Sequence, residues 1–108
     1  MIKATLYLNH DEKYVGFDIK GHARYAESGK DIICSAVSTL SITTVNAIET
    51  FTDASFDGEM DESGSIHFRI TSDLDDKSQL LLSTLALGLT DISNEYGEQY
   101  LKVHYKEV

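Results

Sequence analysis

The spacing of apolar residues constrains the fold most, because it changes repeatedly between the period of a strand and the period of a helix. Strand-like alternation of apolar and polar residues occurs in five segments: 2–8, 15–19, 54–60, 66–70 and 101–105. Helix-like spacing of three and four occurs in two segments: 33–51 and 81–96. The predicted order of elements is therefore ββαββαβ.

This order predicts an α+β two-layer sandwich, in which two helices pack on one face of a five-stranded, largely antiparallel sheet. A chain of 108 residues is long enough for one hydrophobic core and short for two, so residues 1–108 are expected to form a single domain. The second helix also carries apolar residues outside its main stripe, at Leu80, Leu82, Ala86 and Leu87. A helix that is apolar over more than one face needs a second surface to bury, which predicts a homodimer through the helical layer.

Charge and cysteine content narrow the partners and the compartment. The formal net charge of −9 disfavours direct contact with nucleic acid and favours a basic polypeptide partner. No secretory signal and no apolar stretch of about 20 residues is visible, so no membrane association is expected. A single cysteine allows no internal disulfide and suits a reducing compartment, which predicts a cytoplasmic protein.

The residues best suited to chemistry gather around that cysteine, Cys34. Asp31 has the position of a helix N-cap, which puts Cys34 in the first turn, where free backbone N–H groups favour a thiolate and an oxyanion hole. His22 ends the second strand, and the loop 21–30 is short enough to bring it to the thiol as a general base. Ser38 lies one turn further along the same face of the helix.

Each of these residues also has a purely structural explanation. A lone cysteine in a helix usually packs as a small hydrophobe. Capping alone explains Asp31, and Ser38 can fill space against the sheet. The other three histidines are scattered along the chain without metal-ligand spacing, so no metal site is expected. Spacing alone leaves both explanations open.

A longer pattern runs through the same part of the chain: Gly21-His22-Ala23, Gly29-x-Asp31-Ile32-x-Cys34, Ala36, Ser38 and Val45-Asn46-Ala47-Ile48. This pattern resembles the signature of the ribosomal-processing cysteine protease family, often called Prp, of Firmicutes and related bacteria. The resemblance extends over nearly the whole chain in length and in the order of elements. Ser35 departs from it, since the family pattern has alanine after the cysteine.

The resemblance implies roles for individual residues. Cys34 would be the nucleophile and His22 the general base of a protease that needs no cofactor, with Asp31 and Ser38 in support. Its substrate would be the precursor of ribosomal large-subunit protein twenty-seven, whose N-terminal extension it removes during ribosome maturation. Family members are dimers with a flexible loop over the site. The residues placed at the substrate by that loop would be Gly21, Ala23, Arg24, Tyr25 and Gly29.

Two other classes of function stand as alternatives to the protease. A non-catalytic, ribosome-associated binding module predicts a stoichiometric complex that survives loss of the thiol. A redox-sensing thiol protein predicts a partner whose activity responds to peroxide through Cys34.

Overall fold

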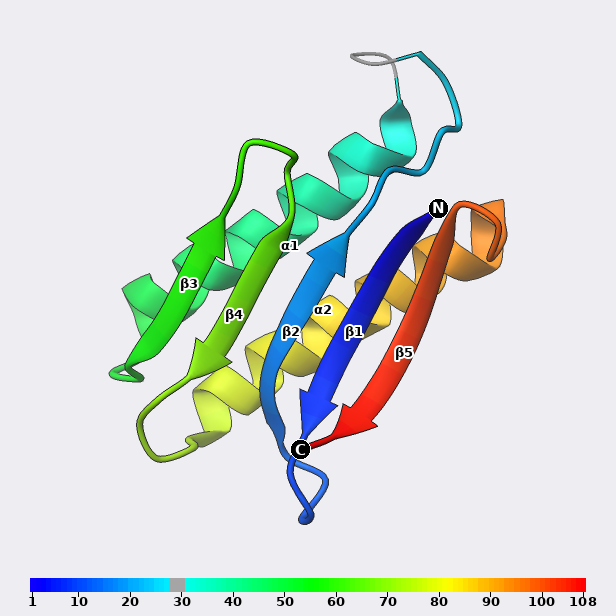
Figure 1. Ribbon diagram of the computed structural model, residues 1–108. Coiled ribbons are helices and arrows are strands. Elements are labelled where there is room, and N and C mark those ends of the chain that lie inside the picture. Colours follow the sequence, from blue (N-terminus) through cyan, green and yellow to red (C-terminus); the bar gives the residue numbers. More distant parts are fainter. Residues whose placement is uncertain (28–30) are drawn as a thin grey trace.

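A computed structural model describes residues 1–27 and 31–108, and it has the predicted order of elements. The elements are β1 (Ile2–Leu8), β2 (Tyr14–Lys20), α1 (Ile32–Phe51), β3 (Phe56–Met60), β4 (Ile66–Ile70), α2 (Asp76–Tyr96) and β5 (Leu101–Glu107). Figure 1 shows both helices on one face of the sheet, with the other face uncovered. The prediction of a two-layer α+β sandwich is confirmed.

The sheet has the strand order β3-β4-β2-β1-β5. Three of its neighbouring pairs are antiparallel, and β1 and β5 are parallel. The sheet is therefore mixed but largely antiparallel, as predicted. The first and last strands of the chain lie side by side (Figure 1).

The core forms where the inward side chains of the strands meet the two helices. Phe17 of β2 stacks on Phe68 of β4 with ring centroids 5.3 Å apart, and both side chains are fully buried. Leu82, Leu85 and Leu89 of α2 are fully buried against this layer. Burying one such side chain contributes about 1.5–3 kcal/mol. The period-two and helical patterns thus converge on one hydrophobic core.

The two helices approach each other closely at Gly88 of α2. A Cβ atom at this position would lie 2.5 Å from Cδ2 of Leu40 on α1, so the glycine makes room for the leucine. Of the four residues that suggested a second apolar face on α2, Leu82 and Ala86 belong to the core. Leu80 and Leu87 remain exposed, so the extra apolar surface is narrower than predicted.

Helix α1 differs in two ways from the sequence-based expectations. Phe51, predicted to continue the buried stripe, is 68% exposed because it is the last residue of the helix. By length and composition alone, α1 is also apolar enough to cross a membrane, whereas no such segment was expected. Its buried residues, among them Ile33, Val37 and Ile48, pack against the sheet. The core helix of a soluble protein can be as long and as apolar as a helix that crosses a membrane.

Candidate functional site

Asp31 organises the start of α1. It is the N-cap, as predicted, and its Oδ1 accepts hydrogen bonds from the backbone N–H groups of Ile33 (3.0 Å) and Cys34 (3.1 Å). Its Oδ2 accepts from the N–H of Tyr25 at 2.9 Å. Burial alone would raise the pKa of Asp31, but backbone N–H groups, including those of Cys34, Tyr25 and Ala26, outweigh it and lower the pKa. The carboxylate thus ties the loop to the helix.

Cys34 lies in the first turn of α1, where the sequence placed it, and it is half-buried at the edge of the core. Its Sγ accepts a hydrogen bond from the backbone N–H of Ala23 at 3.3 Å. Ala23 itself is only 2% exposed. This residue was predicted to lie in a surface loop, but it packs into the core and fixes the start of that loop beside the sulfur.

The hydrogen bond from Ala23 to Cys34 also brings the backbone of His22 close to the thiol. Its carbonyl carbon is bonded to the Ala23 nitrogen, so backbone bond lengths keep the His22 Cα within about 6 Å of the sulfur. The imidazole is exposed and makes no hydrogen bond within residues 1–27 and 31–108. Rotation about its side-chain bonds would therefore break no hydrogen bond to these residues.

An aromatic contact holds the middle of the loop. The ring of Tyr25 meets the rings of Tyr96 and Tyr100 edge-on, with centroids 5.7 Å and 5.1 Å away. Tyr96 ends α2 and Tyr100 precedes β5, so the C-terminal part of the chain supports the site. Sequence reasoning missed this pair, although two tyrosines flanking Gly97 were the available signal.

Backbone geometry shapes the entry to the loop. Gly21 has a φ of 88°, and a Cβ there would overlap the carbonyl oxygen of Met1. Arg24 also adopts a left-handed conformation, with a φ of 57°. Between these two left-handed residues, Ala23 is buried, whereas Arg24 is exposed.

Three predicted features are not joined to this cluster. Ser38 is exposed one turn beyond Cys34 and makes no hydrogen bond to it in the described part of the chain. Gly29 lies outside the described residues. The expected oxyanion hole in the first turn is wrong for Ile33 and Cys34, because Asp31 already accepts from both N–H groups.

The arrangement brings the Cys34 thiol to the backbone that carries His22, whose imidazole is exposed. Across residues 1–27 and 31–108, no three His, Cys, Asp or Glu side chains gather closely enough to hold a metal ion. The Ala23 N–H and the Asp31 cap together fix the position of the thiol.

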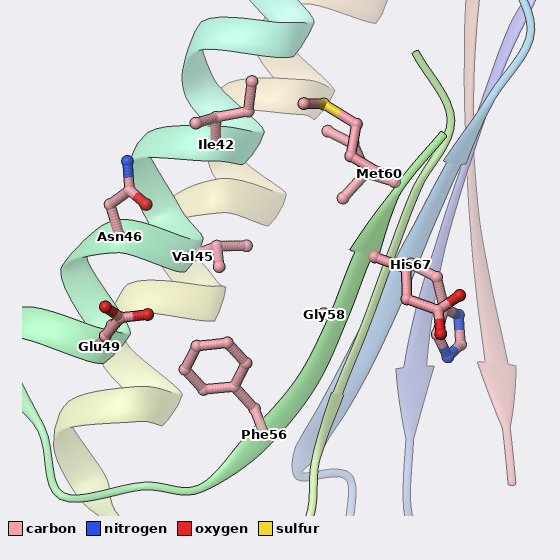
Figure 2. Close-up of a pocket in the computed structure, with 10 residues that line it drawn as sticks. Ile42, Val45, Asn46, Glu49, Phe56, Gly58, Met60 and His67 are labelled. Carbon is pink, nitrogen blue, oxygen red and sulfur yellow. The ribbon is translucent and has the colours of Figure 1, made fainter. Parts of the chain in front are cut away.

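A groove of about 280 Å³ runs between α1 and the edge strand β3. Figure 2 shows Val45 of α1 facing Phe56 and Met60 of β3, with the carboxylate of Glu49 at the rim. Ile42, which also lines the groove, is eight residues beyond Cys34, or about 12 Å along the helix axis. The groove therefore offers an apolar surface on the helix that carries the thiol.

Comparison with known proteins places these features in a family context. Residues 1–102 match the family described as cysteine protease Prp. The ribosomal processing cysteine protease Prp of Staphylococcus aureus is 33% identical over 107 residues, which cover 98% of this chain and all of the relative. Its Bacillus subtilis counterpart is 32% identical over 105 residues, which cover 91% of this chain and 92% of the relative.

Solved structures agree with these matches. A crystal structure of the essential ribosomal processing protease Prp from S. aureus, with a covalently linked product peptide, has a TM-score of 0.92 and 32% identity. A second structure of that enzyme, with a substrate peptide, has a TM-score of 0.87 and 31% identity. Both comparisons cover 98% of this chain and the whole of the solved chain.

Proposed function

The chain belongs to the cysteine protease Prp family, and we propose that it hydrolyses a peptide bond with Cys34 as nucleophile and His22 as general base. The observation that carries this proposal is the hydrogen bond from the Ala23 N–H to the Cys34 sulfur. This bond keeps the adjoining His22 within side-chain reach of the thiol, although twelve positions separate the two residues in sequence. Asp31 acts as a positioning residue, because it holds both the helix turn and the loop.

The reaction follows from these positions. His22 takes the proton of the Cys34 thiol, the sulfur attacks the scissile carbonyl carbon, and a tetrahedral oxyanion forms. Collapse of this intermediate breaks the carbon–nitrogen bond, and His22 gives its proton to the leaving amine. Water then attacks the thioester with His22 again accepting a proton, which releases the acid product and restores the thiol. The imidazole of His22 is exposed and makes no hydrogen bond to the described residues, which suits both directions of proton transfer.

The proposed substrate is the precursor of ribosomal large-subunit protein twenty-seven, cleaved to remove its N-terminal extension. The names of the relatives support a ribosomal substrate, since they are ribosomal processing proteases. The net charge of −9 also draws a basic ribosomal protein toward the enzyme. The groove between α1 and β3 gives an extended segment an apolar contact surface beyond the thiol, and Glu49 and Glu59 at this groove suit basic side chains.

We place this activity in the cytoplasm, where precursor ribosomal proteins are made, and we propose a homodimer through the helical layer. Leu80 and Leu87 support the dimer, because they lie seven residues apart on one face of α2 and are 68% and 63% exposed. Sedimentation of a monomer at micromolar concentration would count against the dimer. Exchange of both leucines for serine is expected to shift a dimer toward monomers.

Cleavage of the full precursor tests the enzyme. The wild-type protein, Cys34→Ala and His22→Ala are each incubated with it, and the products are identified by mass spectrometry. Cys34→Ala is expected to abolish cleavage, and His22→Ala is expected to lower kcat/KM by about 10²- to 10⁴-fold. Ser35→Ala serves as a matched control in the same helical turn and is expected to cleave normally. Cleavage by Cys34→Ala at the wild-type rate would refute the proposal.

A further inference from the structure

The uncovered face of the sheet carries a concentration of positive charge in an otherwise acidic protein. Of the eight lysine and arginine residues in the described part of the chain, five project from it. Lys3 lies directly opposite Lys20 on one side and Lys102 on the other, which forms a row of three lysines across β2, β1 and β5. Lys106 of β5 lies opposite Tyr7 of β1, and Arg69 of β4 lies opposite Gly16 of β2. Both side chains project from the same face. Figure 1 shows this face with no helix over it.

Most of these lysines have no carboxylate beside them. None of the five cations makes an ion pair within residues 1–27 and 31–108, and like charges directly opposite each other on neighbouring strands destabilise a sheet. Asp57 of β3 lies opposite Arg69, and Asp18 attracts Lys20 although it also accepts from the Tyr7 hydroxyl at 2.5 Å and pairs with the His67 ring. Lys3, Lys102 and Lys106 have no carboxylate at a paired position, so they are available to an anion from outside the chain.

The same face has a shallow depression and the planar guanidinium group of Arg69. A depression of about 340 Å³ lies between β1 and β5, lined in part by Lys3, Tyr7 and Lys106. The guanidinium carbon of Arg69 lies 4.7 Å from the centre of the Tyr7 ring. Gly16 permits this position, since a Cβ there would lie 3.1 Å from the Arg69 Nε. The arginine consequently lies across the sheet from β4 toward β1.

We propose that this face binds single-stranded RNA, with its lysines on the phosphates and with bases against the Arg69–Tyr7 stack. Lysine rows satisfy the charge of a phosphate backbone, and aromatic rings and guanidinium planes are the groups on which bases stack. An acidic polypeptide would use the lysines but not the stack. The net charge of −9 does not prevent this binding, because the five cations of this face outnumber its strand carboxylates Asp18, Asp57 and Glu59, and acidic groups beyond the helices are screened here. The molecule is 19 Å across its thinnest direction, and charges are screened over about 10 Å at 0.1 M salt.

Fluorescence anisotropy with a labelled oligouridylate of about twelve nucleotides tests the proposal. Four lysine–phosphate contacts predict that affinity falls about 50-fold between about 50 and 200 mM salt. The variant Lys3→Gln/Lys106→Gln should retain half the contacts and lose only about sevenfold over that range. The control Lys13→Gln/Lys77→Gln removes the same charge from the β1–β2 turn and the start of α2, and it should bind like the wild type.

Three results would overturn the proposal. The first is that the wild type does not bind the RNA at about 50 mM salt. The second is that Lys3→Gln/Lys106→Gln and Lys13→Gln/Lys77→Gln lose the same affinity relative to the wild type. The third is displacement of the RNA by poly-L-glutamate as effectively as by unlabelled RNA of equal charge. This inference does not rest on the proposed protease activity, so Cys34→Ala is expected to bind RNA normally. A failure of cleavage and a failure of RNA binding are thereby separate outcomes.

Discussion

Replacing Asp31 by alanine should damage the site more than it damages the fold. The change removes hydrogen bonds from three backbone N–H groups, those of Ile33, Cys34 and Tyr25. Loss of a helix N-cap costs about 0.5–2 kcal/mol, and the further bond to Tyr25 brings the expected loss of unfolding free energy to about 2–3 kcal/mol. A small domain has about 5–15 kcal/mol of stability, so Asp31→Ala should still fold at 25 °C.

The matched control for this variant is Asp75→Ala. Asp75 caps α2 and accepts from the backbone N–H of Ser78 at 2.7 Å and from its hydroxyl at 2.9 Å. Its removal should cost about 1 kcal/mol but leave the loop at Cys34 untouched. Both unfolding free energies are measured by urea denaturation, and kcat/KM is measured on the precursor well below the transition.

Only Asp31→Ala should impair catalysis. Its loop is no longer held to the helix, and a displacement of about 1 Å in a catalytic group can cost up to about 100-fold in rate, so kcat/KM should fall about 10- to 100-fold. Asp31→Asn should be intermediate, because an amide keeps an acceptor for Ile33 and Cys34 but can turn a donor toward the N–H of Tyr25. Equal activity in Asp31→Ala and Asp75→Ala would refute the role of this carboxylate in holding the site.

Other consequences can be measured on single variants. Gly16→Ala should cost about 3 kcal/mol or more in urea denaturation, because its Cβ would overlap the Phe68 carbonyl oxygen, whereas Gly64→Ala, in open space at a φ of 88°, should cost only about 1–2 kcal/mol. Tyr25→Ala should speed alkylation of Cys34 and proteolysis of the loop, and Tyr25→Phe should not, because the edge contacts need only the ring. The pKa of Asp31 is lowered from 3.8 by folding, so the unfolded state binds more protons and the unfolding free energy falls as the pH drops below about 5 toward the lowered pKa. Asp31→Asn should flatten this acid limb of the stability profile, and an unchanged limb would contradict the assignment.

Sequence patterns predicted the elements well, because each pattern reports a local choice between exposed and buried sides. The alternation in β1 and the capping aspartate before α1 are examples, and both appear in the structure where they were expected. Such patterns could not predict that β1 and β5 are parallel neighbours, since 99 positions separate each pair of residues that face each other. The same applies to the contact of Tyr25 with Tyr100.

Sequence reasoning predicted some of the contacts around Cys34 and missed others. Cys34 and Asp31 were placed by the helix start, and their contact follows from N-cap geometry. Burial of Ala23 was missed, because the loop has no periodicity from which an inward position could be inferred. The prediction of an oxyanion hole was wrong for a related reason. A carboxylate that caps a helix accepts hydrogen bonds from the same N–H groups that the helix-dipole argument treats as free.

The pairing of β5 with β1 also makes the surroundings of Cys34 depend on segments that are far apart in the chain. Tyr100, whose ring contacts that of Tyr25 in the loop, directly precedes β5, and Leu101 of that strand is fully buried. A chain in which β5 has not yet paired with β1 would lack both this contact to the loop and a closed core. The loop beside Cys34 is therefore expected to reach its final position only when the outermost strand has joined the sheet.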